Sequence, residues 1–475
     1  MERKYKNLSC RKIGFEIDRN ISFVPKFGLC TMCSTCESVC PEDAVVIRVN
    51  RKKGTYEPHV LEEKCVQCGI CVDTCPGFEL DLKGLADNSQ NSCRNKFIGS
   101  YNEILRMYST DSVISKSGTS GGMVTGMLDF LLSGGMIDGA IVTRMNEDSP
   151  LETVSYVAST REELLLSQKS KYLPTRLNGI LKPIIRGHIP QKKMAFVGLP
   201  CHIEGLRLAQ QLFPVLKERI VFVFSLFCSR TPTFHASEFL LDCNGINRRD
   251  LKRIDYRGHG HPGKLTFHLK NGSSLSVDHL HWTYWGHAFL NFFWPSRCFV
   301  CPDKTGELAD ISIGDNWQGL WTSVDASSSV IVRNPKMKEL AHQMVSSDKA
   351  VVLNTIDAKE LIRDQDLKKK RSIGPRLLLM RLIGRKTPLY YEKFDLPFKE
   401  IPGAFRLMIH MLVTEHNIPF HFLRTYIYLS YRKKFFLNSL KRRLSGNCSI
   451  KSVCMAPISI LRFFYSLLPG ISRKG

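Results

Sequence analysis

The chain has 475 residues, of which 43% are hydrophobic and 23% charged, and its formal net charge is +23. This length is enough for about two or three domains, and the lack of an apolar window of about 18 residues argues against a membrane-spanning helix. Seventeen cysteines, in a chain whose start lacks a signal-peptide pattern, indicate metal or redox centres in a cytoplasmic protein rather than disulfides.

A repeated cysteine motif follows a polar leader that we assign to residues 1–21. The stretch "CTMCSTCESVCP" begins at Cys30, and "CVQCGICVDTCP" begins at Cys65. Both have the spacing C-x2-C-x2-C-x3-C-P, which holds [4Fe–4S] clusters in bacterial-type ferredoxins. Zinc sites typically separate two C-x2-C pairs by a longer gap, and disulfide frameworks suit small secreted chains. We therefore expect a two-cluster ferredoxin domain at residues 22–85.

The fourth cysteine of each run binds the other cluster in two-cluster ferredoxins, which divides the eight cysteines into two sets. The first thiol set is Cys30, Cys33, Cys36 and Cys75. The second thiol set is Cys40, Cys65, Cys68 and Cys71. Between the runs, "AVVIRVNRKKGTYEPHV" alternates like two strands joined by a Lys-Lys-Gly turn, which fits the short β elements around paired clusters.

After a linker rich in Asn, Ser and Gly, residues 101–250 have the pattern of an α/β region. "SGTSGGMVTGMLDFLLSGG" predicts a Gly/Ser loop and a helix that ends at Gly134-Gly135. "IDGAIVTRM" predicts a buried strand, and "STREELLLSQKS" predicts a helix with a Ser/Thr cap and an acidic first turn. "KKMAFVGLPC" and "ERIVFVFSLFC" predict buried strands with the helix "HIEGLRLAQQLF" between them, which is a βαβ unit.

Residues 251–372 are richer in β pattern. "KLTFHLKNGSSLSV" predicts a hairpin that turns at Asn271-Gly272. "LADISIGDNW" and "SSSVIVRN" predict strands, and "PKMKELAHQMV" predicts a helix with proline in its first turn.

Four further cysteines form a candidate third metal site. Cys201 and Cys228 each follow a predicted parallel strand, where ligands of open α/β sheets collect, and Cys298 and Cys301 form a C-x2-C pair. Together these four residues, the third thiol set, would hold a third [4Fe–4S] cluster. The alternatives are a zinc site and, for the two strand-end cysteines, small buried side chains without a ligand.

Two clusters need both an electron donor and an acceptor, so a site for an organic redox cofactor is a further candidate. The loop Ser115–Gly122 precedes a predicted helix. Small residues let backbone N–H groups approach a phosphate, and a helix N-terminus favours negative charge. Gly/Ser loops are also common simple connections, so this loop alone does not identify a ligand.

Residues 373–475 form a basic tail with many aromatic residues. From Ile401 onward, twelve Arg and Lys side chains stand against Glu415 alone, and they alternate with apolar groups. This pattern is typical of an amphipathic helix on an anionic membrane face or an acidic partner. It is equally typical of a helical extension that packs on its own domain. No motif indicates specific nucleic-acid binding.

These motifs resemble the coenzyme F420 hydrogenase/dehydrogenase beta-subunit family, in the form with an N-terminal double-cluster ferredoxin domain. The resemblance is carried by "SGTSGG", "QKSKYLPTRL", "GLPCHIEGLR", "IDYRGHG" and "CFVCPDKTGELADISIGDNW". It extends from Cys30 to about Val352. The family includes subunits of F420-reducing hydrogenase and F420-linked dehydrogenases, a plant chlorophyll-cycle reductase and members associated with surface-polysaccharide synthesis. The resemblance implies FAD between the clusters and a hydride-accepting substrate.

The resemblance also implies which residues contact the flavin. The flavin-phosphate contacts would be Ser117, Gly118, Thr119, Ser120, Gly121 and Gly122. Further contacts would be Lys169, Ser170, Lys171, Tyr172, Asp315 and Asn316, with Trp317 beside them. For the two lysines, a solvated helix end is the alternative.

Three histidines need separate comment. His202 stands where many family members have Gln, which leaves the substrate open. His259 and His261 are expected in a surface turn, with a proton relay as the alternative. No catalytic acid or base is assigned.

The expected fold is a multidomain α+β and α/β protein. It comprises a ferredoxin fold, an α/β flavin-binding core with a β-rich portion, and the helical basic tail. The expected function is an oxidoreductase that passes electrons between a redox partner such as ferredoxin, the clusters, FAD and F420 or another hydride acceptor. The alternatives are a non-catalytic electron-transfer subunit, or a reductase in surface-polysaccharide or lipid-linked sugar synthesis. The expected location is the cytoplasm, with the tail as a peripheral contact to the inner membrane face.

Overall fold

The computed structural model describes residues 19–86, 93–258, 261, 263–277, 289, 291–318, 326–415, 422–427 and 429. The chain divides into two compact units, Met1–Ile418 and Pro419–Gly475, and the first is described below. Almost all of the predicted polar leader lies outside the described residues. Within the described ranges, no helix has the length and apolar character needed to cross a membrane.

The N-terminal part has short helices and strands around the two cysteine runs, as a ferredoxin-type domain requires. Its elements are α1 (Phe23–Lys26), α2 (Thr35–Ser38), β1 (Val45–Asn50), β2 (Thr55–Val60), α3 (Ile70–Asp73), β3 (Glu79–Leu80) and α4 (Leu82–Leu85). Strands β1 and β2 pair antiparallel, which confirms the predicted hairpin. Its turn is closed by the Gly54 N–H, which donates to the Asn50 carbonyl at 2.8 Å.

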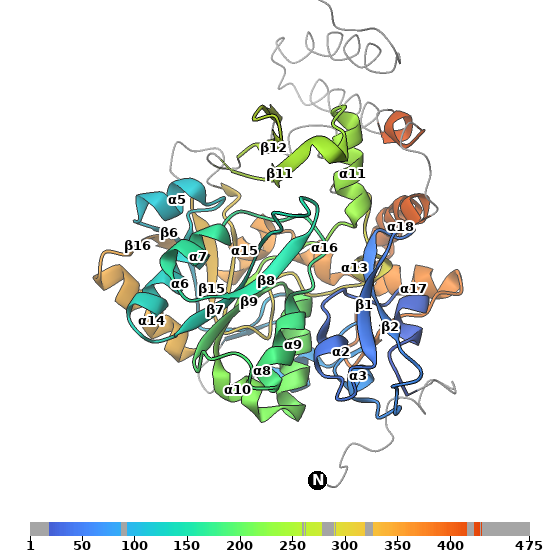
Figure 1. The fold of residues 1–475 in the computed structure, drawn as a ribbon, viewed down its shortest axis with the longest axis horizontal. Helices are drawn as coiled ribbons and strands as arrows, with labels where there is room; N and C mark the ends of the chain where they lie inside the picture. The colour runs from blue at the N-terminus through green and yellow to red at the C-terminus, as the bar shows by residue number, and fades with distance from the viewer. Residues whose placement is uncertain are drawn as a thin grey trace, which may run out of the picture. The chain divides into compact units, whose positions relative to one another are not determined.

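The centre of the unit is an eight-stranded mixed sheet in the order β16-β6-β15-β14-β10-β9-β7-β8 (Figure 1). The strands are β6 (Glu103–Ser109), β7 (Gly139–Met145), β8 (Thr153–Ala158), β9 (Met194–Gly198), β10 (Ile220–Leu226), β14 (Ile311–Asp315), β15 (Ser328–Val332) and β16 (Ala350–Thr355). Strands β14, β10, β9 and β7 are parallel, and the remaining pairs are antiparallel. The sheet therefore takes strands from both segments, 101–250 and 251–372.

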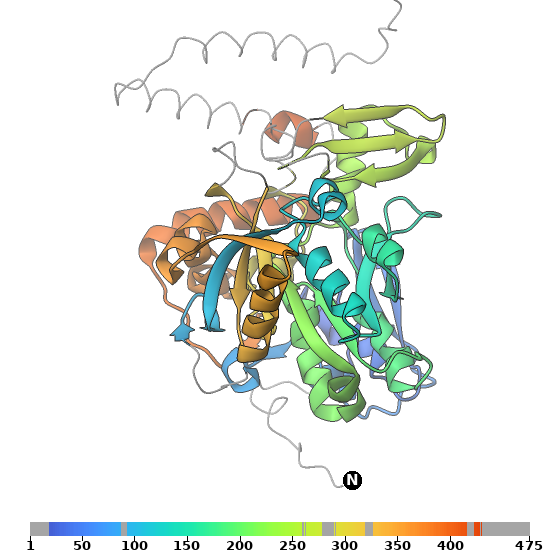
Figure 2. The same ribbon diagram turned by 90° about the vertical axis from the view of Figure 1, so that its left-hand side faces the viewer.

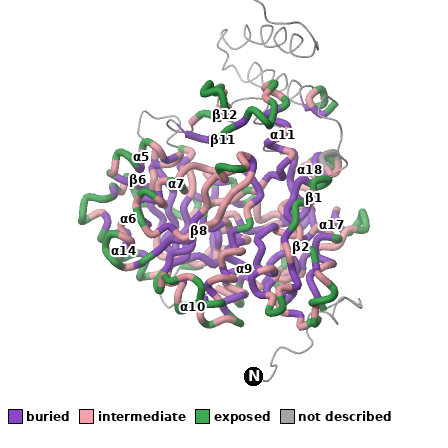
Figure 3. The backbone as a smooth tube through the Cα atoms, in the orientation of Figure 1, coloured by how far each residue is buried: buried purple, intermediate pink, exposed green. Residues whose placement is uncertain are grey.

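Helices cover both faces of this sheet, which explains why its central strands are apolar without alternation. One face packs against α6 (Met123–Ser133), α7 (Arg161–Leu166) and α14 (Pro335–Ser346). The other packs against α8 (Leu181–Ile185), α9 (Pro200–Leu212) and α10 (Pro214–Arg219). In β10, Phe224 faces the first layer and Val223 the second. Figure 3 shows buried backbone running through these layers.

The predicted βαβ unit is confirmed as β9, α9 and β10, and local signals fix several helix starts. Helix α7 begins at a capping box formed by Thr160 and Glu163. Asn334 caps α14 ahead of its first-turn proline. The hairpin β12 (Leu265–Leu269) and β13 (Ser274–Val277) also forms as predicted. With β11 (Leu251–Asp255) it makes a separate three-stranded sheet beside α11 (Phe234–Cys243), visible in Figure 2.

The remaining elements of the unit connect these layers. They are β4 (Cys93–Asn95), β5 (Gly99–Tyr101), α5 (Ser112–Ser117), the 3-10 helix η2 (Leu177–Ile180), α13 (Ser296–Phe299), α15 (Ala358–Asp364) and α16 (Leu367–Arg371). Helix α15 packs on Ile104 and Ile331 of the sheet through Leu361.

The beginning of the predicted tail packs on the rest of this unit. For these residues, the structure therefore favours an extension that packs on its own domain over a helix on a membrane face. It forms α17 (Gly374–Leu382), β17 (Leu389–Tyr390) and α18 (Ile401–Glu415). Strand β17 pairs in parallel with β3 of the ferredoxin-type domain. Met380 and Met408 are buried in one cluster with Phe299 and Val300. The tail beyond residue 415 lies outside the described residues, except for 422–427 and 429.

Candidate redox site

Four strands bring the candidate site residues to one edge of the central sheet. Strands β6, β14, β10 and β9 run in the same direction, because β15 between β6 and β14 is antiparallel to both. Their carboxyl ends therefore share an edge, where α/β sheets collect ligands. In the order of the strands, this edge carries the loop 117–122, Asp315, Cys228 and Cys201.

The first thiol set lines one cavity. Its four cysteines enclose this cavity together with Met32, Tyr56 and neighbouring residues. Burial raises the pKa of Cys30, and the Cys33 and Cys75 thiols raise it further. Cys75, from the second run, thus meets cysteines of the first, as the crossed pattern predicts. A buried thiolate carries a negative charge that is costly to bury. Binding of the thiolate to a metal cation would offset this free-energy cost.

The second thiol set shows the reciprocal arrangement. Burial raises the pKa of Cys71 to about 12, and the next contributions come from the Cys68 and Cys40 thiols. Cys40 belongs to the first run, so the two runs exchange their fourth cysteines. Among the described residues, no three His, Cys, Asp or Glu side chains lie close enough to share a single metal ion.

Three segments bring the third thiol set together. Burial is the main cause of the raised pKa of Cys201. Glu204 and the thiols of Cys228, Cys33 and Cys298 raise this pKa further. Burial also raises the pKa of Cys228 to about 12, and the Cys298 and Cys301 thiols add to this. The Cys33 thiol contributes to the raised pKa of Cys201, which indicates that the first and third thiol sets are near each other.

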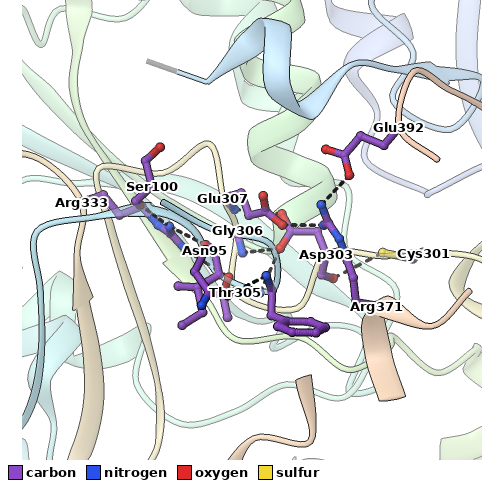
Figure 4. Close-up of polar contacts among 12 residues, drawn as sticks. Asn95, Ser100, Cys301, Asp303, Thr305, Gly306, Glu307, Arg333, Arg371 and Glu392 are labelled. Atoms are coloured by element: carbon purple, nitrogen blue, oxygen red, sulfur yellow. Dashed lines mark hydrogen bonds and ion pairs between the residues drawn. The ribbon is translucent and has the colours of Figure 1, made fainter. Parts of the chain in front are cut away.

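A dense polar network holds the loop that carries Cys301 (Figure 4). The Asp303 carboxylate accepts hydrogen bonds from the N–H groups of Thr305, Gly306 and Glu307 at 2.8–3.0 Å. Arg371 forms ion pairs with Glu307 at 2.5 Å and with Glu392 at 2.7 Å. These contacts fix the loop against α16.

The predicted flavin loop is tied to the sheet edge by Arg257. This guanidinium forms an ion pair with Asp315 at 2.7 Å and donates to the Thr119 carbonyl at 2.9 Å. Burial opposes ionisation of Asp315, but Arg257 outweighs it and lowers the Asp315 pKa. The Tyr172 hydroxyl also interacts with Arg257. Three predicted contacts, Thr119, Tyr172 and Asp315, therefore surround one side chain.

The loop has the donors that a phosphate group needs. Among the described residues, the backbone N–H groups of Thr119, Ser120 and Gly121 have no protein acceptor. They precede the N-terminus of α6, so their dipoles add to that of the helix. The donor set fits a flavin pyrophosphate.

Gly121 is required by the protein itself. Its φ is +67°, and a Cβ there would lie 2.7 Å from the Ala326 carbonyl oxygen and 2.9 Å from the Ser327 Cα. A side chain at this position would therefore displace the loop from β15 before it met a phosphate.

The Lys169–Tyr172 segment lies beside the same site. Lys169 has φ +69° and forms an ion pair with Asp255 at 2.9 Å. The Lys171 side chain donates to the carbonyls of Ser167, Gln168 and Lys169, and burial lowers its pKa to about 7. Lys171 thus ties down the end of α7. The Tyr172 ring packs edge-on against Tyr256 with centroids 5.8 Å apart.

The histidines have distinct environments. His202 is buried, accepts from the Leu199 N–H and donates to the Thr175 carbonyl, and burial lowers its pKa to about 4. His261 lies in a bend and is half-buried, and its Nδ1–H donates to the Thr119 carbonyl at 2.8 Å. Its Nε2 is buried and has no hydrogen-bond partner among the described residues. His259 lies outside the described residues.

Arg257 and Asp255 were not predicted as site residues from the sequence. Both lie in "IDYRGHG", which carried part of the family resemblance. Asp255 ends β11 and Arg257 lies in the bend that follows it, so the available signal was the family motif itself. Asn316 donates to Ser327 at 2.9 Å and supports the loop ends.

Comparison with known proteins finds three matching family models. Residues 104–182 match "Coenzyme F420 hydrogenase/dehydrogenase, beta subunit N-term", and residues 191–358 match the model for the C terminus of the same coenzyme F420 hydrogenase/dehydrogenase beta subunit. Residues 29–77 match "4Fe-4S dicluster domain".

Individual relatives are distant. The coenzyme F420-dependent sulfite reductase of Methanocaldococcus jannaschii is 28% identical over 77% of this chain, which spans only 52% of that protein. The coenzyme F420 hydrogenase subunit beta of Methanothermobacter thermautotrophicus is 28% identical over 49% of this chain and 81% of its own. One subunit of the F420H2 dehydrogenase of Methanosarcina mazei is 25% identical over 63% of this chain and 81% of its own. A chain of the F420-reducing hydrogenase complex of Methanosarcina barkeri has a TM-score of 0.49 at 23% identity, covering 62% of this chain and 98% of that one.

Proposed function

Because the chain belongs to the coenzyme F420 hydrogenase/dehydrogenase beta-subunit family and carries a 4Fe–4S dicluster domain, we propose that it is an iron–sulfur flavoprotein oxidoreductase. It would move electrons between a one-electron donor at the ferredoxin-type domain and a hydride carrier such as coenzyme F420. Bound FAD would supply the conversion between one-electron and hydride chemistry. The relatives named above are F420-dependent oxidoreductases or their subunits.

One observation supports this proposal: the three thiol sets lie near one another, and the sheet edge that carries Cys201 and Cys228 also carries the candidate flavin loop. The second thiol set adjoins the first, and Cys33 of the first interacts with Cys201 of the third. Cys228 then follows β10, and Asp315 ends the neighbouring strand β14. Gln365 and Lys304 connect these last two positions: the Gln365 amide donates to the Asp315 carbonyl, the Lys304 ammonium donates to the Gln365 carbonyl, and the Cys228 N–H donates to the Lys304 carbonyl at 2.8 Å. Such an order suits electron transfer from the ferredoxin-type domain to a flavin.

The chain's own residues would bind and orient each group. The three thiol sets would bind three [4Fe–4S] clusters. The free N–H groups of the 119–121 segment would bind the FAD phosphates, and Arg257 would hold that segment against Asp315. The Tyr172 ring, fixed by Tyr256, would form a wall of the flavin site. His261, whose Nδ1–H donates to the Thr119 carbonyl, would place its Nε2 at the same site.

The alternative is an electron-transfer protein without a substrate of its own. Two of the named relatives are described as subunits, and this chain would then deliver electrons to a partner protein. Turnover by the isolated chain separates the two functions. Purified anaerobically with iron, sulfide and FAD, it is expected to oxidise reduced F420 with methyl viologen. Each hydride supplies two electrons, so two viologen molecules are reduced per F420. Loaded clusters and flavin without turnover would favour the electron-transfer role.

The metal content tests the three thiol sets. We expect about twelve irons and twelve sulfides per chain, and about eight of each in a Cys298→Ser/Cys301→Ser variant. Cys243→Ser is the control, because Cys243 belongs to none of the sets and should leave the count unchanged. About eight irons in the unmodified protein, unchanged in the double variant, would exclude the third cluster. Zinc in place of the extra iron would indicate a structural site.

A further inference from the structure

Four cationic side chains interact with the thiols of the third set. They are Arg230, Arg297, Arg376 and Lys370, called here the cation shell. They come from different segments, so the charge is concentrated by the fold. Arg376 donates to the Phe299 carbonyl at 2.9 Å, and the Lys370 ammonium donates to the Ser229 carbonyl at 2.6 Å. Both backbone acceptors adjoin a cysteine of the set.

Two guanidinium groups of the cation shell retain a buried donor with no acceptor. Arg297 is 2% exposed and donates to the carbonyls of Gly77 and Pro76 at 3.2 and 2.9 Å. Its Nη1 and that of Arg230 are buried without a hydrogen-bond partner among the described residues. Buried donors are nearly always satisfied, and an exception can indicate a missing ion. A cluster ligated by four thiolates would supply the anionic sulfur acceptors.

The two ferredoxin thiol sets have a different electrostatic environment. Arg297 of the cation shell places a positive charge near Cys75 of the first set. Glu57, in contrast, places a negative charge near Cys30 of the same set. For Cys71 of the second set, the leading contributions are burial and the thiols of Cys68 and Cys40. Glu204 also places an acidic group near Cys201, but four cationic side chains act on the third set, so positive charge still predominates there.

We propose that the cation shell holds the reduction potential of the third cluster above the potentials of both ferredoxin clusters. The inference rests on the proposed function, since it requires a cluster at the third thiol set. The reduced form of a cluster carries one more negative charge than the oxidised form. Buried positive charges and N–H donors therefore favour reduction, and potentials respond to both. At equilibrium, electrons that enter the ferredoxin-type domain collect at the third cluster, beside the sheet edge with the flavin loop.

Arg230→Gln tests this proposal in the full-length, cluster-loaded protein. The variant removes one positive charge from the cation shell and keeps a polar side chain. In an anaerobic titration followed by electron paramagnetic resonance, the reduced-to-oxidised ratio of the third cluster at fixed potential should fall about tenfold. For a one-electron couple this equals a shift of about 59 mV to lower potential. The ferredoxin signals should stay in place. Arg161→Gln is the matched control, because Arg161 pairs with Asp111 and Asp129 and is expected to shift no cluster.

Lys370→Gln decides the question if Arg230→Gln does not fold, because Lys370 is partly exposed. A lower reduced-to-oxidised ratio of the third cluster supports the proposal. The decrease should be smaller than in Arg230→Gln, because solvent screens the charge of Lys370. About twelve irons with an unchanged ratio in the folded variants overturns the inference and leaves the proposed function standing. About eight irons in the unmodified protein overturns both the third cluster and this inference. A third cluster with a potential below the ferredoxin clusters also overturns the inference.

Discussion

At the scale of single residues, Arg257 connects the separate pieces of the candidate flavin site. Its partners come from the strand end at Asp315, the Gly/Ser loop at Thr119 and the segment after α7 at Tyr172. The Arg257 side chain is buried and the Asp315 side chain is 17% exposed, so Arg257 depends on Asp315 for its counter-charge. Removing one partner of a fully buried pair typically costs about 3–5 kcal/mol, and the partial exposure of Asp315 reduces this cost.

We expect Arg257→Gln to lose most of its flavin. The substitution leaves Asp315 without its main counter-charge and releases the Thr119 carbonyl, so the loop loses its position. Flavin per protein after anaerobic gel filtration should fall at least tenfold, while the iron content of the ferredoxin-type domain is kept. Arg253→Gln is the control, since that arginine pairs with Asp255 at 3.2 Å but is 54% exposed. Full flavin occupancy in Arg257→Gln would show that the loop is held by other contacts.

Gly121→Ala and Gly135→Ala form a matched pair. Both glycines have positive φ, at +67° and +65°, but only Gly121 lies against backbone. We expect Gly135→Ala to lower the free energy of unfolding by about 1 kcal/mol, from the strained φ alone. Gly121→Ala should cost about 1–3 kcal/mol more, because the Cβ overlaps the Ala326 carbonyl. Thermal unfolding of the flavin-free protein measures both. Equal costs would mean that β15 yields to the added methyl group.

At the scale of elements, local patterns predicted what depends on neighbours in sequence. The ferredoxin runs, the unit β9-α9-β10 and the cap of α7 follow from spacing, apolar runs and capping residues. The order of the sheet did not follow, because β15 and β6 pair over more than 200 residues of chain and no local signal sets that pairing. For the same reason, the amphipathic pattern of α17 and α18 showed an apolar face without showing which surface it covers.

The contact between α11 and the β1–β2 hairpin should depend on pH. His235 Nδ1 lies 2.9 Å from a Glu238 carboxylate oxygen, and Nε2 lies 3.2 Å from the Lys52 carbonyl. Both partners are acceptors, so only the protonated ring donates to both. Glu238 raises the pKa of His235 above its usual value of about 6.5. A raised pKa means that the stabilisation is complete below pH 6.5 and is lost as the pH rises through the folded-state pKa.

Hydrogen exchange of the Phe234 N–H, which donates to the Gly54 carbonyl at 2.8 Å, reports on this contact. After correction for the intrinsic exchange rate, its protection should fall about fivefold from pH 6 to pH 8, as expected for about 1 kcal/mol. His235→Gln should remove this dependence. His342→Gln, in α14, should leave it as in the unmodified protein. A pH dependence that persists in His235→Gln would assign it to another group.

At the scale of the whole molecule, hydrogen bonds and ion pairs hold the ferredoxin-type domain against the segments that cover the central sheet. Ser38 donates to the Asn178 carbonyl at 2.6 Å, and Arg186 pairs with Asp43 at 2.6 Å. A Cβ on Gly205 of α9 would lie 2.3 Å from the Thr35 Oγ1, so the glycine allows the close approach of α2. These contacts keep the first and third thiol sets next to each other. The sequence could name the cysteines but not this proximity, because the contacts join residues more than 100 positions apart.

Two truncations distinguish the structural part of the predicted tail from the rest. Ending the chain after Ile418 removes the second compact unit, and residues 419–475 carry eleven Arg or Lys and no Asp or Glu. We expect this variant to keep its thermal midpoint, iron and flavin. Ending the chain after Gly403 also removes the buried Met408 and Met411 of α18. The loss of each large buried side chain costs about 2–5 kcal/mol. This shorter variant should therefore have a lower thermal midpoint and should lose the iron bound by the third thiol set.

Co-sedimentation with vesicles then tests the charge of the removed segment. Basic residues near an anionic leaflet each contribute about 1 kcal/mol of attraction. The full chain should therefore sediment with vesicles that contain an anionic lipid, and added salt should release it because screening shortens the range of the charges. Neutral vesicles are the control. The chain that ends at Ile418 should remain in the supernatant with its iron intact. If it still sediments, the lipid-binding charge lies in the first unit. If it loses its iron, residues 419–475 support the fold instead.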